Sequence, residues 1–126
     1  ELLSLELDRD EYAPGDTGIV TFVWRSVMPM KRDYRVVCHM NAPGGPDINV
    51  DHYLLNGAIT TARLRPGQVV RERYAFAIPS AAAGRTYTMG VGLWNRKRDI
   101  KLPVRSATRP VAGGWIVVAG KFRVKP

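Results

Sequence analysis

Cysteine is almost absent from this sequence of 126 residues, in which Cys38 is the only one. No disulfide can therefore form within the chain, and the Cys-x-x-Cys spacing of zinc and dithiol sites is missing. We expect Cys38 to be a small buried hydrophobe. Long apolar runs are also absent, because none is longer than the run from Trp115 to Ala119. A membrane-spanning helix needs about 18 apolar residues, so we expect no transmembrane segment.

Helical periodicity is the next feature that the sequence lacks, since apolar residues do not recur at intervals of three and four over any useful length. Apolar residues recur at every second position instead, as in Val20, Phe22 and Trp24. This period is typical of strands with one buried face. The strands predicted in this way cover residues 3–7, 17–26, 34–40, 48–54, 70–78, 85–95, 100–104 and 115–124. Gly120 lies inside the last strand, where it indicates a bulge or bend.

Turn signals separate these strands, with Pro-Gly at residues 14–15 and 66–67 and Asn-Gly at 56–57. Short strands with turn signals about every eight to twelve residues are typical of antiparallel β-sandwiches. We therefore predict a single all-β domain over residues 1–126. Its expected fold is an immunoglobulin-like antiparallel β-sandwich with two sheets, about seven to nine strands and Greek-key connections. One sheet should contain residues 34–40, 85–95 and 115–124, and the other residues 3–7, 17–26 and 70–78.

Three groups of residues follow one another along nearly the whole chain. They are Tyr12-x-Pro-Gly-Asp16; Asp33-Tyr-x-Val36 with His39 and Asp51-His52; and Leu64-x-Pro-Gly67 with Ile78-Pro79, Gly84-x-x-Tyr87 and Val91-Gly-Leu-Trp94. This order resembles immunoglobulin-like accessory domains of bacterial cell-surface and secreted proteins, which are appended to membrane glycosyltransferases and glycoside-active enzymes. The resemblance implies an extracytoplasmic module excised from a larger protein, with neighbouring domains as its partners. It also implies that Tyr87 forms a tyrosine corner, whose hydroxyl bonds to the backbone.

Charge is unevenly distributed along the chain, which has 19 Lys and Arg against 11 Asp and Glu, a net charge of +8. Residues 1–16 hold one base and six acids, a balance of −5, so the remaining 110 residues carry +13. Residues 96–126 hold nine bases and only one acid, Asp99. Such polarity suits an anionic neighbour, such as an acidic glycan or another protein's acidic face, whereas general solubility is the alternative. We do not expect nucleic acid as a partner, because its binding modules interleave more stacking aromatics with their bases.

The acidic residues do not form a pattern that predicts catalysis or calcium binding. Strand alternation places Glu72 on the same face as the apolar residues of its strand. Because it lies near the start of the strand, we expect it to be exposed to solvent and without a partner. Two facing carboxylates, as glycoside hydrolysis needs, are therefore not expected. Asp8, Asp10 and Asp16 lack the spacing of a calcium loop and should form a solvated acidic turn. We predict that the chain is not an enzyme and uses no cofactor.

Metal-ligating side chains cluster only around His39. Strand alternation sends His39 to the face opposite Cys38 and Met40, so these three neighbours cannot easily form one copper site. His39 and Asp51 should form a hydrogen-bonded pair between neighbouring strands. A zinc site that also includes His52 is not expected, because a third and fourth ligand are missing.

Two tryptophans and several bases form the candidate binding site. By strand parity Trp94 and Trp115 both point away from the core, and antiparallel pairing of their strands brings them to the same end of one sheet. Indole faces can stack on sugar rings, and guanidinium groups bind carboxylate, sulfate or phosphate. The candidate ligand-binding residues are Trp94, Trp115, Arg96, Arg98, Lys31 and Arg32. The alternative is that the indoles pack beneath residues 96–110 or against a neighbouring domain.

These observations favour a non-catalytic structural or interaction module of a bacterial envelope or secreted protein, which positions or docks a partner domain. The alternative is a carbohydrate-binding module that recognises a glycan, including an anionic one, through the tryptophan and arginine patch. Loss of glycan binding on replacing Trp94 and Trp115 would distinguish the second function from the first.

Overall fold

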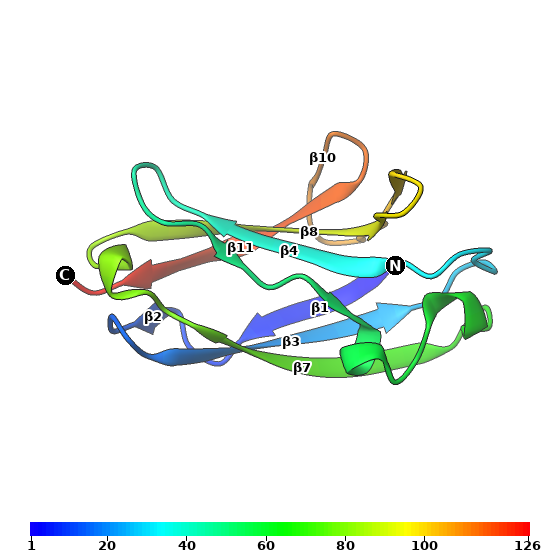
Figure 1. The fold of residues 1–126 in the computed structure, drawn as a ribbon, viewed down its shortest axis with the longest axis horizontal. Helices are drawn as coiled ribbons and strands as arrows, with labels where there is room; N and C mark the ends of the chain where they lie inside the picture. The colour runs from blue at the N-terminus through cyan, green and yellow to red at the C-terminus, as the bar shows by residue number, and fades with distance from the viewer.

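Two sheets packed face to face form the protein, and the computed structural model describes all residues 1–126 (Figure 1). The first sheet has the order β1–β3–β7, with β1 at Leu2–Leu7, β3 at Thr17–Arg25 and β7 at Val69–Ala77. The second sheet is centred on β4 (Arg35–Asn41), β8 (Thr86–Asn95) and β11 (Ile116–Val124), and it is strongly curled. The predicted all-β sandwich is confirmed, and so is the division of its six main strands between the two sheets.

Short elements complete the second sheet. β2 (Glu11–Tyr12) pairs in parallel with β11, while β10 (Val111–Ala112) pairs antiparallel with β11. The strand predicted over residues 48–54 is two fragments, β5 (Ile48–Asn49) and β6 (His52–Tyr53), both paired with β4. Between the fragments the Asp51 carboxylate accepts the Cys38 N–H at 2.8 Å, so a side chain replaces the backbone acceptor that a continuous strand would supply.

The edge of β8 opposite β4 has two successive partners. It pairs with β11 as far as Val91, and from Leu93 onward it pairs with β9 (Ile100–Leu102) instead. β4 stays beside the other edge of β8 along the whole stretch from Thr88 to Trp94. The β8–β9 hairpin therefore continues the sheet beyond the point where β11 begins.

Helical structure is limited to three short 3₁₀ segments, η1 (Leu54–Gly57), η2 (Thr61–Arg63) and η3 (Ser80–Ala82). Each has only three or four residues, so no helix in this chain has the length and apolar character to cross a bilayer. η1 and η2 lie in the long connection between β6 and β7, beside the space between the sheets.

A continuous apolar core of 26 buried residues fills the space between the sheets. Alternate residues of β3, namely Val20, Phe22 and Trp24, belong to it as predicted. Cys38 is buried in the same core, and burial, aided by the nearby Asp51 carboxylate, raises the pKa of its thiol to about 12. Because the thiolate is the reactive form, Cys38 serves here as a packing residue.

The predicted alternation in β1 is wrong at its start. Sequence parity places Leu3, Leu5 and Leu7 on one face, but the pairing of β1 with β3 shifts register between Leu2 and Ser4. This irregularity buries Leu2 together with Leu5 and leaves Leu3 36% exposed. A bulge changes the face on which neighbouring side chains lie, and no glycine in this strand indicates it from the sequence.

β8 and β11 carry two further features that the sequence predicts. The register between them shifts between Val118 and Gly120, and Gly120 has a φ of +137°, so the bulge expected at this glycine is confirmed. The Tyr87 hydroxyl donates a hydrogen bond to the carbonyl of Pro46 at 2.7 Å. Since Pro46 lies in the β4–β5 connection, this bond ties β8 to a distant loop and is not the local bond of a tyrosine corner.

The two ends of the sandwich are built differently (Figure 1). The left-hand end, which we call the closed end, holds β2 and the C-terminal end of β11 (Figure 1). There the Phe122 ring of β11 packs on Tyr12 and Tyr87 with centroid distances of 5.4 and 5.1 Å. At the right-hand end, which we call the open end, the β3–β4 connection (residues 26–34) meets the β8–β9 turn and residues 103–105. The chain begins beside the open end and finishes at the closed end.

Candidate functional site

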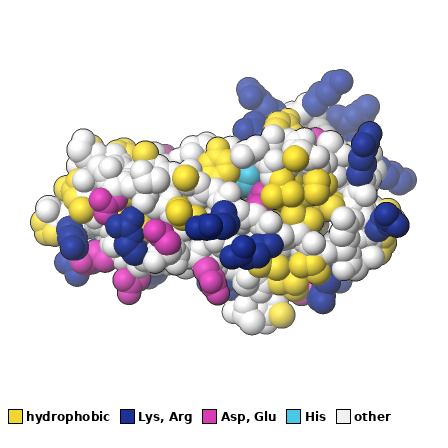
Figure 2. Space-filling model, turned by 90° about the horizontal axis from the view of Figure 1, so that it is seen from below, with side chains coloured by type: hydrophobic (Ala, Val, Ile, Leu, Met, Phe, Trp, Pro, Cys, Tyr) yellow, Lys and Arg dark blue, Asp and Glu magenta, His cyan; other side chains and the backbone are white.

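Seven cationic side chains gather at the open end. They come from the β3–β4 connection, the β8–β9 hairpin and the segment after β9, and we call them the cationic cluster: Lys31, Arg32, Arg96, Lys97, Arg98, Lys101 and Arg105. None of the seven forms an ion pair within the protein. Figure 2 shows Lys and Arg side chains standing out along the right-hand end, whereas most of the visible Asp and Glu lie in the left half.

The acidic side chains near the cationic cluster are already engaged by other groups. Asp33 accepts a backbone N–H at 3.0 Å, and Asp99 accepts the indole N–H of Trp94 at 2.9 Å. Glu1 forms an ion pair with Arg25. Asp33 and Asp99 keep their negative charge, but the seven cations outnumber them, so a net positive field is available to an anionic partner.

Trp94 and Trp115 lie outside the core on the second sheet, with Lys101 between them in the structure. Lys101 is paired with Trp94 in the β8–β9 ladder, and its ammonium lies over the Trp115 ring, 5.1 Å from the centroid. Trp115 also packs on Gly92, where an added Cβ would be only 2.7 Å from the indole. Both indoles are half-buried, and two residues of the segment 96–110 contact them: Asp99 bonds to Trp94, and Lys101 lies over Trp115.

The six candidate ligand-binding residues fall into two groups. One group lies around the β8–β9 hairpin and the start of β11: Trp94, Trp115, Arg96 and Arg98. The other group lies on the β3–β4 connection and lines a pocket: Lys31 and Arg32. A hydrogen bond of 2.9 Å from the Asn95 side chain to the Asp33 carbonyl joins the two segments. The six residues thus share one end of the molecule, but the tryptophans do not line the pocket.

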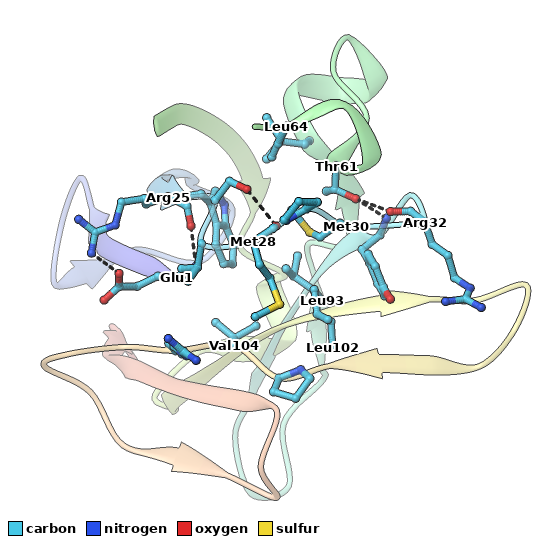
Figure 3. A pocket seen from close by; sticks show the side chains of 18 of the residues that line it. Glu1, Arg25, Met28, Met30, Arg32, Thr61, Leu64, Leu93, Leu102 and Val104 are labelled. Carbon is cyan, nitrogen blue, oxygen red and sulfur yellow. Dashed lines mark hydrogen bonds and ion pairs between the residues drawn. The ribbon is translucent and has the colours of Figure 1, made fainter. Parts of the chain in front are cut away.

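A pocket of about 470 Å³ opens between the two sheets at the open end (Figure 3). Apolar side chains make up most of its wall, among them Trp24, Met28, Met30, Leu93, Leu102 and Val104. In Figure 3 the Met28 side chain reaches from the β3–β4 connection towards Leu102 and Val104, and Leu64 lies on the other side. Sequence reasoning missed this pocket. Its one signal was the apolar run from Val27 to Met30, in a connection where polar turn residues are usual.

The β3–β4 connection that borders the pocket is fixed at its two ends. The Ser26 N–H donates to the Gln68 carbonyl at 2.9 Å, and the Thr61 hydroxyl donates to the Arg32 carbonyl at 3.0 Å. Residues 27–31 between these anchors take part in no hydrogen bond between backbone groups. The exposed fractions of Val27 and Met28 are 40% and 59%, so apolar surface faces solvent at the mouth of the pocket.

The predicted pair of His39 and Asp51 is present on the outer side of β4. His39 Nε2 lies 3.2 Å from one carboxylate oxygen of Asp51 and 3.3 Å from the other. The Asn49 side chain reaches the same imidazole nitrogen at 3.3 Å. Because the His39 side chain is about half exposed, this pair is a surface feature of the fold and not an enclosed site.

The sequence-based prediction for Glu72 is wrong, because its side chain is neither exposed to solvent nor without a partner. Only 4% of it is exposed, and its carboxylate lies 2.8 Å from His52 Nε2 in the space between the sheets. It also accepts the Leu55 N–H at 2.9 Å and the Trp24 indole N–H at 3.4 Å. The interrupted β5–β6 segment, which turns His52 inward, brings the partner that sequence parity alone could not supply.

The hydrogen bonds of His52 fix the position of its protons. Its Nδ1 lies 2.7 Å from the Val50 carbonyl, which can only accept, so Nδ1 carries a proton. Nε2 faces the Glu72 carboxylate, and one proton must lie between these two groups. Burial opposes charge on the ring, but the bonds to Glu72 and Val50 prevail and raise the pKa of His52 above its ordinary value of 6.5. The two side chains therefore share one proton, and their other hydrogen-bonding groups are satisfied inside the core.

The acidic turn near the closed end is closed by internal bonds. Asp8 accepts the Tyr12 hydroxyl at 2.7 Å and the Ile19 N–H at 2.8 Å, while Asp16 pairs with Arg9 at 3.0 Å. No three His, Cys, Asp or Glu side chains in the structure are grouped so that they could hold a metal ion.

Comparison with models of known protein families finds no match to this chain, and comparison with curated protein sequences finds none either. The open end, with its unpaired cations, half-covered tryptophans and apolar pocket, is the part of the molecule from which function can be argued.

Proposed function

We propose that this chain is a non-catalytic interaction module of a bacterial envelope or secreted protein, which positions a partner domain by binding its acidic surface through the open end. The observation that carries the proposal is the cationic cluster, whose seven Lys and Arg side chains form no ion pair with an acidic side chain of the protein. Clustered charge of one sign speeds encounter with an oppositely charged surface and orients the partner.

The shape of the molecule supports a positioning role. Residue 1 lies beside the open end and residue 126 at the closed end, so the two termini are separated along the long axis of the sandwich (Figure 1). The core between the sheets is apolar, and its buried ionisable pair, His52 and Glu72, is satisfied internally. Such a body keeps a fixed length between two attachments.

A polyanion-binding measurement tests the docking surface. We expect poly-L-glutamate to bind the protein with an affinity that falls steeply between low and high salt, because exposed charges are screened. The double variant Arg96→Glu and Arg98→Glu should weaken binding by about ten- to thirtyfold. The matched control is Arg71→Glu and Arg73→Glu, which changes the net charge equally on exposed positions of β7.

Equal losses in the two double variants would mean that net charge alone drives binding, and the proposed docking surface would be wrong. Salt-independent binding of poly-L-glutamate would contradict the proposal as well. Circular dichroism of each variant checks that the sandwich is intact.

A second candidate function is recognition of an anionic glycan, favoured by the position of Lys101 against Trp115 and beside Trp94. An acidic polysaccharide such as alginate should then quench tryptophan fluorescence to saturation, and Trp94→Ala with Trp115→Ala should abolish the effect. Alginate and poly-L-glutamate binding with unchanged affinity in the tryptophan variant would leave the acidic docking surface as the better account.

A further inference from the structure

We propose that the pocket at the open end is a binding site for an amphipathic anion with a single alkyl chain, of the fatty-acid type. The alkyl chain of this ligand lies among the apolar walls between the sheets, and its anionic head group stays at the mouth of the pocket beside Lys31 and Arg32. This function goes beyond docking of an acidic surface, because it depends on the apolar walls and not on the β8–β9 turn.

The walls of the pocket suit a hydrocarbon better than a polar ligand. The hydroxyls of Ser26 and Thr61 are both used by the protein, since they donate to the carbonyls of Met28 and Arg32 at 3.4 and 3.0 Å. The indole N–H of Trp24 is directed at Glu72. The Tyr34 hydroxyl is the one uncharged side-chain donor of the lining without a partner in the protein, so a sugar or a peptide would leave most of its polar groups unpaired inside, at a cost in free energy. The volume of about 470 Å³ falls within the range of sites that enclose small ligands.

The mouth of the pocket has the opposite character, because positive charge surrounds it. Lys31, Arg32 and Arg105 line it and form no ion pair. The single acidic residue of the lining, Glu1, is neutralised by Arg25. Apolar walls below a cationic mouth are complementary to a carboxylate or sulfate group on an alkyl chain, and they disfavour a cationic amphiphile.

The β3–β4 connection gives the site an adaptable edge. Residues 27–31 have no hydrogen bonds between backbone groups, and two of them, Val27 and Met28, expose apolar surface to solvent. Methionine side chains are flexible and fit irregular apolar shapes, so Met28 can close over a chain that enters. Both sheets bound the pocket, which therefore admits one chain at a time and favours a monomeric amphiphile over a bilayer.

Calorimetric titration of the protein with sodium dodecanoate, kept below its micellar concentration, tests the proposal. We expect one saturable site. Across octanoate, decanoate and dodecanoate, affinity should rise about fourfold for each added methylene until the pocket is filled. Dodecyltrimethylammonium, which has a positive head, should bind at least tenfold more weakly than dodecanoate.

Two variants and two matched controls locate the site. Met28→Asp should lower the dodecanoate affinity by at least tenfold, whereas Val111→Asp, an exposed apolar position on β10, should leave it within twofold. Lys31→Glu should lower it by about three- to tenfold, whereas Lys97→Glu, the same charge change outside the pocket lining, should leave it within twofold. All four positions are exposed, so the variants are expected to fold.

Absence of saturable dodecanoate binding, or an affinity that does not depend on chain length, would overturn the proposal. Equal losses in the variants and their controls would do the same. The proposal would also be overturned if the protein bound vesicles of anionic phospholipid but did not bind monomeric dodecanoate. The open end would then be a membrane-docking surface. The variant with Arg96→Glu and Arg98→Glu should bind poly-L-glutamate more weakly but bind dodecanoate with unchanged affinity, which separates a failure here from a failure of the docking proposal.

Discussion

The same main strands run through the closed end and the open end, yet the two ends hold their loops in different ways. At the closed end Phe122 packs against Tyr12 and Tyr87, and the Tyr87 hydroxyl holds the β4–β5 connection. At the open end residues 27–31 of the β3–β4 connection cross a pocket without hydrogen bonds between backbone groups, and the cationic cluster forms no ion pair. The difference teaches that the core is filled completely at one end, whereas the other end leaves space between the sheets for binding, since tight packing and an open pocket exclude each other locally.

The largest expected effect tests the stabilising role of the closed end. Phe122→Ala removes the ring that contacts both tyrosines and leaves a cavity in the core, so we expect the free energy of unfolding to fall by about 3–5 kcal/mol. Urea denaturation followed by circular dichroism measures it. A loss below about 1 kcal/mol would mean that the closed end does not carry the stability assigned to it.

The buried pair of His52 and Glu72 between the ends sharpens the comparison, because it contributes stability that depends on pH. The pKa of His52 is raised in the folded protein, so the contribution is complete below about pH 6.5 and is lost as the pH rises through the folded pKa. Glu72→Gln should lower the free energy of unfolding by about 1–3 kcal/mol at pH 6 and flatten its decline between pH 6 and 9. A variant that keeps the full pH dependence would show that another group causes it.

The hydroxyl tie at the closed end has a smaller expected effect. Tyr87→Phe keeps the ring against Phe122 but removes the donor to the Pro46 carbonyl. We expect a loss of about 1–2 kcal/mol in the free energy of unfolding, with an unchanged circular dichroism spectrum. An unaltered urea midpoint would show that the bond between β8 and the β4–β5 connection contributes nothing to stability.

The smallest expected effect lies at the open end. Met28→Ala should change the free energy of unfolding by no more than about 0.5 kcal/mol, because the side chain is mostly exposed and its segment has no hydrogen bonds between backbone groups. The same variant should weaken dodecanoate binding. A loss of several kcal/mol would remove the distinction between a stabilising end and a binding end.

Local features of the fold were predictable from the sequence. Alternation in β3 identified the buried face of Val20, Phe22 and Trp24, and Gly120 marked the bulge in β11. The pair of His39 and Asp51 followed from the expected neighbourhood of two strands. Each of these features depends on residues a few positions apart or on the pairing of two strands. The alternation of apolar residues and the positions of turn residues predict such features directly.

Features that depend on several segments were not predictable in this way. The bond between His52 and Glu72 needs the break between β5 and β6, where the Asp51 side chain replaces a backbone acceptor. The pocket needs the β3–β4 connection, η2, β8 and β9 to meet at one end. The exposure of Leu3 follows from a register shift that leaves no residue signature. Nonlocal packing decides all three, and a single sequence contains little information about it.

The exchange of strand partners along β8 has a consequence for how this protein can be altered. Because β9 replaces β11 beside β8 from Leu93 onward, residues 96–115 form a side branch that begins and returns at the rim of the sheet. Turns of other lengths or sequences can be grafted at the exposed residues 96–99 of this branch while every ladder of the six main strands stays paired. A library built on residues 96–99 would accordingly sample new binding specificities on an unchanged scaffold.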